Sequence, residues 1–256
     1  MSTFEIVPLR AFSDNYIWTL RDATRAVVVD PGDATPVIEY LDREGLALAA
    51  ILNTHHHADH VGGNAELLQR WKVPVFGPHD DRIPDVTQRL ADGEHLTLPH
   101  FNTELEVMEI PGHTRSHIAF YGSGMLFCGD TLFAAGCGRL FEGTPKQMHH
   151  SLTRLAKVPG ATRVYCGHEY TLSNIRFAKA VEPGNKSLID FEQRASRQRE
   201  QDLPTLPTDI AQELTTNPFL RVQEPEVIAS ASRHAGRPLQ DPVEVLGALR
   251  EWKNNF

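Results

Sequence analysis

Short apolar runs separated by polar turns dominate the first two thirds of the chain. Runs rich in β-branched and aromatic residues, or alternating apolar with polar positions, predict strands. These runs are 4–8, 16–20, 26–29, 49–52, 73–76, 105–110, 118–121, 125–128 and 163–166. Apolar positions at helical spacing predict helices between some of the strands, at 34–44, 61–71 and 146–157.

The pattern changes after about residue 172, where strand-like runs disappear. Helical stretches follow, interrupted by prolines, at 172–182, 187–201, 208–216, 223–235 and 241–253. We therefore expect an α/β domain over residues 1–172 and a small helical domain over 173–256.

Side chains able to bind metals follow four of the predicted strands. The run 49–52 leads into residues 54–60, which read THHHADH, and three later strands end in a histidine or aspartate beside a glycine. The candidate ligands are His55, His57, Asp59, His60, His113, Asp130 and His168. Because loops at strand ends converge in layered α/β proteins, we expect these residues to share a site.

Spacing divides the histidine-rich segment into two pairs. His55, His57 and Asp59 lie two residues apart, so in an extended loop they project to one side. His60 follows where the chain turns into a helix. One metal can therefore use His55 and His57, and a second can use Asp59 and His60.

Seven ligands exceed the needs of one tetrahedral ion, and a structural zinc site would more often use cysteines. The expected division is His55, His57 and His113 at one ion, Asp59, His60 and His168 at the other, and Asp130 as bridge. Paired ions lower the pKa of a shared water from about 15.7 toward 7. Asp59 and Asp130 are expected to hold the resulting metal-bridging hydroxide, suited to hydrolysis of an activated acyl group or a phosphodiester. Redox chemistry at iron remains an alternative.

Other polar residues carry more ordinary predictions. Asp30, at the end of the run 26–29, is either an acceptor that orients a ligand histidine or a simple turn residue. His79, His95 and His100 each stand alone, and we expect them to face solvent. His117 is predicted to be structural.

Composition limits the function. Lysine and arginine number 25 and aspartate and glutamate 33, so the net charge of −8 argues against general nucleic-acid binding. The first residues lack the pattern of a signal peptide, and no apolar run is long enough to span a membrane. The three cysteines show no C-x-x-C spacing and are expected to be buried and reduced, which favours a cytoplasmic protein.

These motifs resemble those of the metallo-β-lactamase superfamily, whose H-x-H-x-D-H signature is similar to residues 55–60. Within the superfamily the chain resembles the glyoxalase II (hydroxyacylglutathione hydrolase) family. The segments that carry this closer resemblance are 14–16 (DNY), 61–64 (VGGN), 136–144 (GCGRLFEGT) and 217–221 (NPFLR). The resemblance covers the whole chain, including the helical tail.

The resemblance implies an αββα sandwich with a C-terminal α-helical domain that covers the site. It also implies hydrolysis of S-D-lactoylglutathione to glutathione and D-lactate, the second step of methylglyoxal detoxification. Two divalent ions per chain are expected, with zinc as the first choice and iron or manganese as alternatives. The implied substrate contacts are Arg139, Phe141, Tyr170, Arg250 and Lys253. The expected partner is a small glutathione thioester, bound by a monomer without nucleic acid or membrane.

Some positions depart from the family pattern. Ala58 replaces a tryptophan or tyrosine, and Phe141 lacks the hydroxyl of a family tyrosine, which removes one polar contact to glutathione. Arg250 and Lys253 would give an acidic protein the local cationic clamp that an anionic substrate needs. The alternative is that both lie at a solvated helix end.

Proteins of other classes compete with this interpretation. An iron-dependent persulfide dioxygenase of the same superfamily would use one metal and leave the second set of ligands idle. A nuclease of this fold would need a basic surface. A non-catalytic metal-binding protein would not require cations beside an open metal site.

Overall fold

The structure is a computed structural model that describes residues 4–256. It divides into two compact units, unit 1 (Met1–Glu109 and Ser116–Gly129) and unit 2 (Ile110–Arg115 and Asp130–Phe256). This division differs from the domain boundary near residue 172, which stays a prediction. Met1 to Thr3, part of the segment in which no signal peptide is expected, lie outside the described residues.

The first sheet of unit 1 follows the order of the chain. Its strands are β1 (Glu5–Ala11), β2 (Asn15–Arg21), β3 (Arg25–Val29), β4 (Ala47–Leu52), β5 (Val75–Pro78) and β6 (Gln88–Leu90). β1 to β3 pair antiparallel, and β3 to β6 pair parallel. The sequence does not predict β6, because Gln88 and Arg89 are polar and the strand forms the edge of the sheet.

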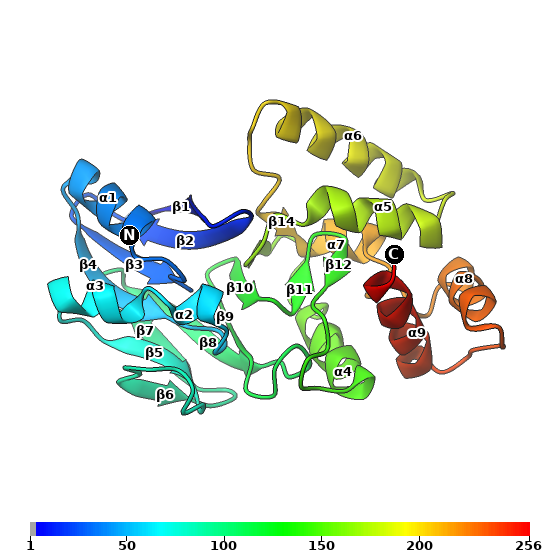
Figure 1. Ribbon diagram of the computed structural model, residues 1–256, viewed down its shortest axis with the longest axis horizontal. Coiled ribbons are helices and arrows are strands. Elements are labelled where there is room, and N and C mark those ends of the chain that lie inside the picture. The colour runs from blue at the N-terminus through cyan, green and yellow to red at the C-terminus, as the bar shows by residue number, and fades with distance from the viewer. Residues whose placement is uncertain (1–3) are drawn as a thin grey trace. The chain divides into compact units, whose positions relative to one another are not determined.

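Helices α1 (Thr35–Glu44) and α3 (Asn64–Arg70) lie along this sheet (Figure 1). Val37 and Leu41 of α1 belong to one fully buried apolar cluster with Leu67 of α3 and with Val28 and Ile51 of the strands. The apolar face of each helix is thus removed from water, which is the main source of stability for short helices.

Where the sequence predicts one helix over 61–71, the structure has α2 (Ala58–Val61) and then α3. The break lies at Gly62 and Gly63. The amide of Gly63 donates to the carbonyl oxygen of Pro31, at 2.9 Å. The acceptor lies in a loop 32 residues earlier in the chain, so local spacing could not predict this bond.

The second sheet of unit 1 contains β7 (His95–Leu98), β8 (Thr103–Glu109), β9 (Ile118–Gly122) and β10 (Met125–Gly129), each antiparallel to the next. β7 lies in a mostly polar segment for which the sequence predicts no strand or helix. It alternates buried Leu96 and Leu98 with exposed His95 and Thr97, a pattern too short to recognise in the sequence.

Unit 2 is mostly helical. Its strand pairs are β11 (Leu132–Phe133) with β12 (Gly136–Cys137) and β13 (Arg163–Cys166) with β14 (Thr208–Asp209). Its helices are α4 (Pro145–Leu155), α5 (Thr171–Val181), α6 (Lys186–Glu200), α7 (Ile210–Thr216), α8 (Pro225–Ala235) and α9 (Pro242–Asn254). All six lie within two residues of the predicted ranges.

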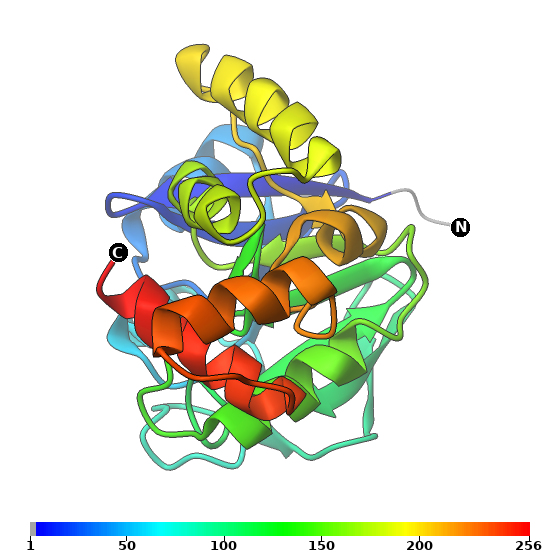
Figure 2. The same cartoon turned by 90° about the vertical axis from the view of Figure 1, so that its right-hand side faces the viewer.

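Side-chain caps fix the first turn of several of these helices. Thr144 forms a capping box with Gln147 at the start of α4, and Asn185, Asp209 and Asp241 cap α6, α7 and α9. Figure 2 shows α8 and α9 side by side, in agreement with their mutual contacts. Between residues 4 and 256, no helix combines the length and apolar character needed to cross a membrane.

Candidate functional site

The histidine-rich loop of unit 1 begins where β4 ends. His55 and His60 are buried, and His57 and Asp59 are partly buried. Nε2 of His55 lies 3.2 Å from Nδ1 of His57, and the ring centres of His55 and His60 lie 4.1 Å apart. His55 and His57, two of the three residues predicted to project to one side, thus lie together, and the same orientation of Asp59 stays a prediction.

Asp30 orients this loop from the end of β3. One carboxylate oxygen accepts from the amide of Thr54 at 2.7 Å, and the other accepts from the Thr54 hydroxyl at 2.7 Å. The second oxygen also lies 3.1 Å from Nδ1 of His60. The expectation that Asp30 reaches a histidine of the loop is confirmed. An acceptor at Nδ1 places the proton there and leaves the Nε2 lone pair of a neutral ring for another partner.

Two further side chains brace the loop. Asn15 donates to the carboxylate of Asp59 at 3.0 Å and to its carbonyl oxygen at 3.3 Å. His117 is fully buried, stacks on His55 at 4.5 Å, and its Nδ1 lies 3.0 Å from the Ile118 carbonyl oxygen. His117 is therefore a packing residue, as predicted. The sequence places Asn15 in a motif but does not reveal its contact with Asp59.

Unit 2 brings together its own set of three candidate ligands. His113 follows β8, Asp130 follows β10 and His168 follows β13, and all three are buried. One oxygen of Asp130 lies 3.5 Å from Nε2 of His113 and 3.3 Å from Nε2 of His168. Three of the seven predicted ligands are thus adjacent within unit 2.

His113 shows why this set suits a cation. Its Nδ1 lies 2.8 Å from the carbonyl oxygen of Arg139, which makes Nδ1 the protonated nitrogen of a neutral ring. Nε2 then directs a lone pair toward the Asp130 carboxylate. Two acceptors facing each other repel unless a cation or proton lies between them. Imidazole and carboxylate donors of this kind fit zinc, iron and manganese.

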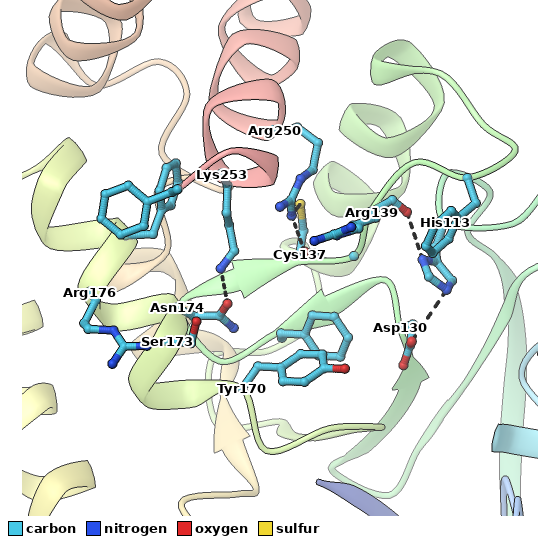
Figure 3. Close-up of a pocket in the computed structure, with 15 residues that line it drawn as sticks. His113, Asp130, Cys137, Arg139, Tyr170, Ser173, Asn174, Arg176, Arg250 and Lys253 are labelled. Atoms are coloured by element: carbon cyan, nitrogen blue, oxygen red, sulfur yellow. Dashed lines mark hydrogen bonds and ion pairs between the residues drawn. The ribbon is translucent and has the colours of Figure 1, made fainter. Parts of the chain in front are cut away.

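A cavity of about 650 Å³ in unit 2 adjoins these residues (Figure 3). His113 and Asp130 lie at one end of the cavity, and four cationic side chains contribute to the rest of its lining. The cations are Arg139, Arg176, Arg250 and Lys253. Helix α5 contributes Ser173, Asn174, Arg176 and Phe177.

Arg250 and Lys253 project from α9 into this cavity. Arg250 is buried and donates to the carbonyl oxygen of Cys137 at 2.7 Å. Lys253 is half-buried and contacts the side-chain oxygen of Asn174. Both contacts are with neutral groups, so the positive charge remains available to an anion. For Arg250, burial excludes the alternative of a solvated helix end.

Burial also changes the acidity of Lys253. Removal from water, together with the nearby charge of Arg250, lowers the pKa of the Lys253 ammonium from 10.5 to about 8. The side chain is therefore still mostly protonated at pH 7.

Aromatic side chains form the remaining walls. Tyr170 stacks on His168 at 4.7 Å and meets Phe133 edge-on at 5.3 Å. Phe141 lies edge-on to His113 at 5.3 Å and is 63% exposed. All five predicted substrate contacts line the cavity, although their role in binding stays a prediction.

Several cavity residues were missed by the sequence analysis. Ser173, Asn174 and Phe177 follow Tyr170 at intervals of three, four and seven, which places them on one helix face. That spacing could have identified them. The lone histidines His79, His95 and His100 are exposed, as predicted. The three cysteines are buried and form no disulfide within residues 4–256, which agrees with their expected reduced state.

Comparison with known proteins identifies both parts of the chain. A family model described as the metallo-beta-lactamase superfamily matches residues 12–168, and one described as the hydroxyacylglutathione hydrolase C-terminus matches residues 169–256. The hydroxyacylglutathione hydrolase of Nitrosomonas europaea is 53% identical over 251 residues, covering 98% of this chain and 96% of that relative. The Pseudomonas aeruginosa protein of the same name is 53% identical, covering 98% of this chain and 99% of that relative.

Solved structures agree on the fold. The crystal structure of ETHE1 from Myxococcus xanthus has a TM-score of 0.66 at 24% identity and covers 98% of both chains. That of TTHA1623 in a di-iron-bound form has a TM-score of 0.59 at 27% identity, covering 84% of this chain and all of that one. The predicted α/β sandwich with a C-terminal helical region is confirmed. The chain belongs to the hydroxyacylglutathione hydrolase family of the metallo-β-lactamase superfamily.

Proposed function

We propose that the protein hydrolyses S-D-lactoylglutathione and related 2-hydroxyacyl glutathione thioesters to glutathione and the free hydroxy acid. The single observation that carries the proposal is the cavity of unit 2, which joins His113 and Asp130 to a cationic lining suited to anionic glutathione. Relatives about half identical over the full chain bear the matching name. The proposed reaction is the second step of methylglyoxal detoxification.

Metal binding is part of the proposal. The proposed ligands are His55, His57 and His113 for one ion, Asp59, His60 and His168 for the other, and Asp130 as the bridge. Each unit brings its own share of these donors together, and a related protein has been solved in a di-iron-bound form. We propose zinc, with iron or manganese as alternatives. Such ions, when bound, act as Lewis acids toward water and a thioester carbonyl.

The protein's own residues have separate tasks. Asp59 and Asp130 are proposed to hold the hydroxide nucleophile, and Asn15 and Asp30 keep the loop of unit 1 in place. Tyr170 supplies an apolar wall beside His168. The departing glutathione thiolate is a good leaving group, so we assign no strong general acid to this step.

Arg250 and Lys253 are proposed to bind the glycine carboxylate of glutathione. Arg250 donates to a backbone carbonyl oxygen, and Lys253 contacts a side-chain amide oxygen. Neither of these partners is a carboxylate, so an anion can bind without displacing one of them. Arg139 lines the same cavity and adds a third cation. This lining explains how a chain of net charge −8 can bind an anion.

The alternative of an iron-dependent persulfide dioxygenase is less well supported. It would leave the second set of ligands without a role, and the relatives named above are hydrolases. Cytoplasmic location and a monomeric state remain predictions.

Hydrolysis of S-D-lactoylglutathione by the purified protein tests the proposal, measured before and after chelation, with metals counted on the same sample. We expect chelator-sensitive turnover with about two metals per chain, and loss of turnover in His55→Ala and Asp130→Ala. Absence of turnover in a sample that holds both metals would refute the substrate. Full activity in His55→Ala would refute the ligand assignment.

A further inference from the structure

The turn between β11 and β12 is held by side chains from other parts of unit 2. The side-chain amide of Asn217 donates to the carbonyl oxygens of Phe133, at 3.1 Å, and Gly136, at 2.9 Å. The amide of Asn174 donates to the Ala134 carbonyl oxygen at 2.9 Å. The backbone amide of Ala135 donates to a carboxylate oxygen of Glu213 at 2.8 Å.

The turn needs this support because of its conformation. Ala135 has φ of +53°, in the left-handed region that residues with a Cβ rarely occupy. Its neighbours Phe133 and Ala134 are buried, so their backbone groups cannot rely on water. A left-handed alanine in a buried turn persists when the surrounding structure holds it there.

Glu213 is the ionisable member of this support and has no part in the chemistry proposed above. It is fully buried, and both of its oxygens are engaged. One accepts from the hydroxyl of Thr208 at 2.8 Å, and the other accepts from Ala135 and from the amide of Asn217, at 2.9 Å. Burying a carboxylate is costly, so a gain elsewhere is expected to offset it.

The segment held by this turn leads directly into the cavity. Phe133 and Cys137 flank the turn and line the cavity, and Arg139 follows two residues later. The carbonyl oxygen of Cys137 is the acceptor for Arg250. Asn174, which holds Ala134, also contacts Lys253. Displacement of the turn would therefore move the contacts of both α9 cations.

We propose that Glu213 is a positioning residue for substrate binding, which acts through the β11–β12 turn to align the cationic wall of the cavity. This inference rests on the proposed function. Glu213 touches no reacting atom, so its loss should weaken the binding of glutathione more than it slows the chemical step.

A second buried carboxylate in unit 2 offers a matched control. Glu182 is 3% exposed and receives two hydrogen bonds from Arg221, at 2.8 and 2.9 Å. It caps no part of the β11–β12 turn and does not line the cavity. Removing Glu182 should cost stability without changing the affinity for glutathione.

The experiment compares Glu213→Ala, Glu213→Asp and Glu213→Gln with Glu182→Ala, all metal-loaded and assayed well below their melting temperatures. KM and kcat are measured with S-D-lactoylglutathione, and the dissociation constant of glutathione is measured by calorimetry. We expect Glu213→Ala to raise KM and the dissociation constant by roughly tenfold, with kcat and metal content changed less than about threefold. Glu213→Asp should act in the same direction because its shorter side chain withdraws from Ala135.

Glu213→Gln should restore near-normal affinity. Its amide oxygen can accept from Ala135 and Asn217 while its NH₂ group donates to the Thr208 hydroxyl. If Glu213→Ala does not fold, the glutathione affinity of Glu213→Asp tests the inference in its place. Unchanged glutathione affinity in the Ala or Asp variant, or an equal loss in Glu182→Ala, would overturn the inference. Absence of thioester turnover in the unsubstituted protein would instead refute the proposed function.

Discussion

At the scale of single residues, the surroundings of Lys253 and Asp30 decide what each can do. Lys253 is an ordinary lysine in the sequence, but partial burial beside Arg250 brings its pKa close to the physiological range. Asp30 ends a strand, yet it accepts two hydrogen bonds from Thr54 and contacts His60. The role of each residue can be tested by substitution.

Substrate binding should depend on the charge of Lys253. Because its pKa is lowered from 10.5 to about 8, the ammonium loses its proton as pH rises through 8, and affinity for an anionic substrate should fall there. We expect KM to rise between pH 8 and 10 while kcat changes less, and Lys253→Ala to raise KM roughly tenfold at pH 7. KM is measured across this range after subtraction of spontaneous hydrolysis. Lys253→Arg keeps its charge up to pH 10, so its KM should change little with pH. The same rise of KM in Lys253→Arg would show that another group causes the pH dependence.

Asp30 should govern metal affinity without being needed to bind substrate. Asp30→Ala removes the acceptor of Thr54 and His60, and loss of such an outer contact weakens metal binding by about 10- to 100-fold. Competition with a chromophoric chelator measures this change. Asp33→Asn is the control, because it removes a nearby charge and keeps an oxygen that can accept from the Thr35 amide. Equal zinc affinity in Asp30→Ala and the unsubstituted protein would contradict the role.

At the scale of elements, the strand ends carry the candidate ligands, and tight turns pack beside them. The bounds of most strands and helices follow from apolar periodicity and caps, as in α4 with its Thr144 capping box. The exceptions are β6, β7, the two-residue strands β11, β12 and β14, and the break between α2 and α3. They depend on an edge position, on a pattern too short to recognise, or on a distant hydrogen bond. Such causes lie outside a local window of sequence.

Gly138 illustrates how closely these turns pack. A Cβ at this position would lie 1.9 Å from the Asp130 carbonyl oxygen and 3.0 Å from Nδ1 of His113. We expect Gly138→Ala to displace this segment. The melting temperature should fall, and kcat/KM should fall by at least about tenfold. Gly124→Ala is the control, since nothing lies within 4 Å of its Cβ and its only cost comes from a φ of +76°. Full activity in Gly138→Ala would show that the turn accommodates the added Cβ without disturbing the site, which would contradict this prediction.

At the scale of the whole molecule, Glu213 links the stability of the fold to pH. Burial raises the pKa of this carboxyl from 4.5 to about 7, despite hydrogen bonds from Asn217, Thr208 and Ala135 that favour the ionised form. Between these two values the folded protein keeps a proton that the unfolded chain releases. Stability should therefore fall as pH rises from 4.5 to 7, by roughly 3 kcal/mol from this group.

Urea unfolding at pH 5 and pH 7 tests this linkage. The unsubstituted protein should lose more free energy of unfolding between these pH values than Glu213→Gln, which has no proton to release. The difference between the two proteins isolates Glu213 from the other carboxylates. An equal change in the free energy of unfolding between pH 5 and pH 7 in both proteins would show that the Glu213 carboxyl has an ordinary pKa.

The division of the molecule into units also shows where prediction from sequence ends. The helical tail and its approximate start near residue 172 follow from the loss of strand-like runs. The compact units cut the chain elsewhere, because residues 110–115 and 130–172 pack with that tail. Packing partners are chosen by burial and shape, which a local pattern does not record.

The sequence by itself determined most of the elements, the family resemblance and the identity of the candidate ligands, because each depends on residue type and short spacing. Tertiary structure alone decided the bracing of the histidine loop by Asn15 and Asp30, the neutral partners of Arg250 and Lys253, and the buried support of the β11–β12 turn by Glu213. These contacts join residues separated by 24 to 113 positions. Hydrogen bonding and burial at such separations exist only after the chain has folded.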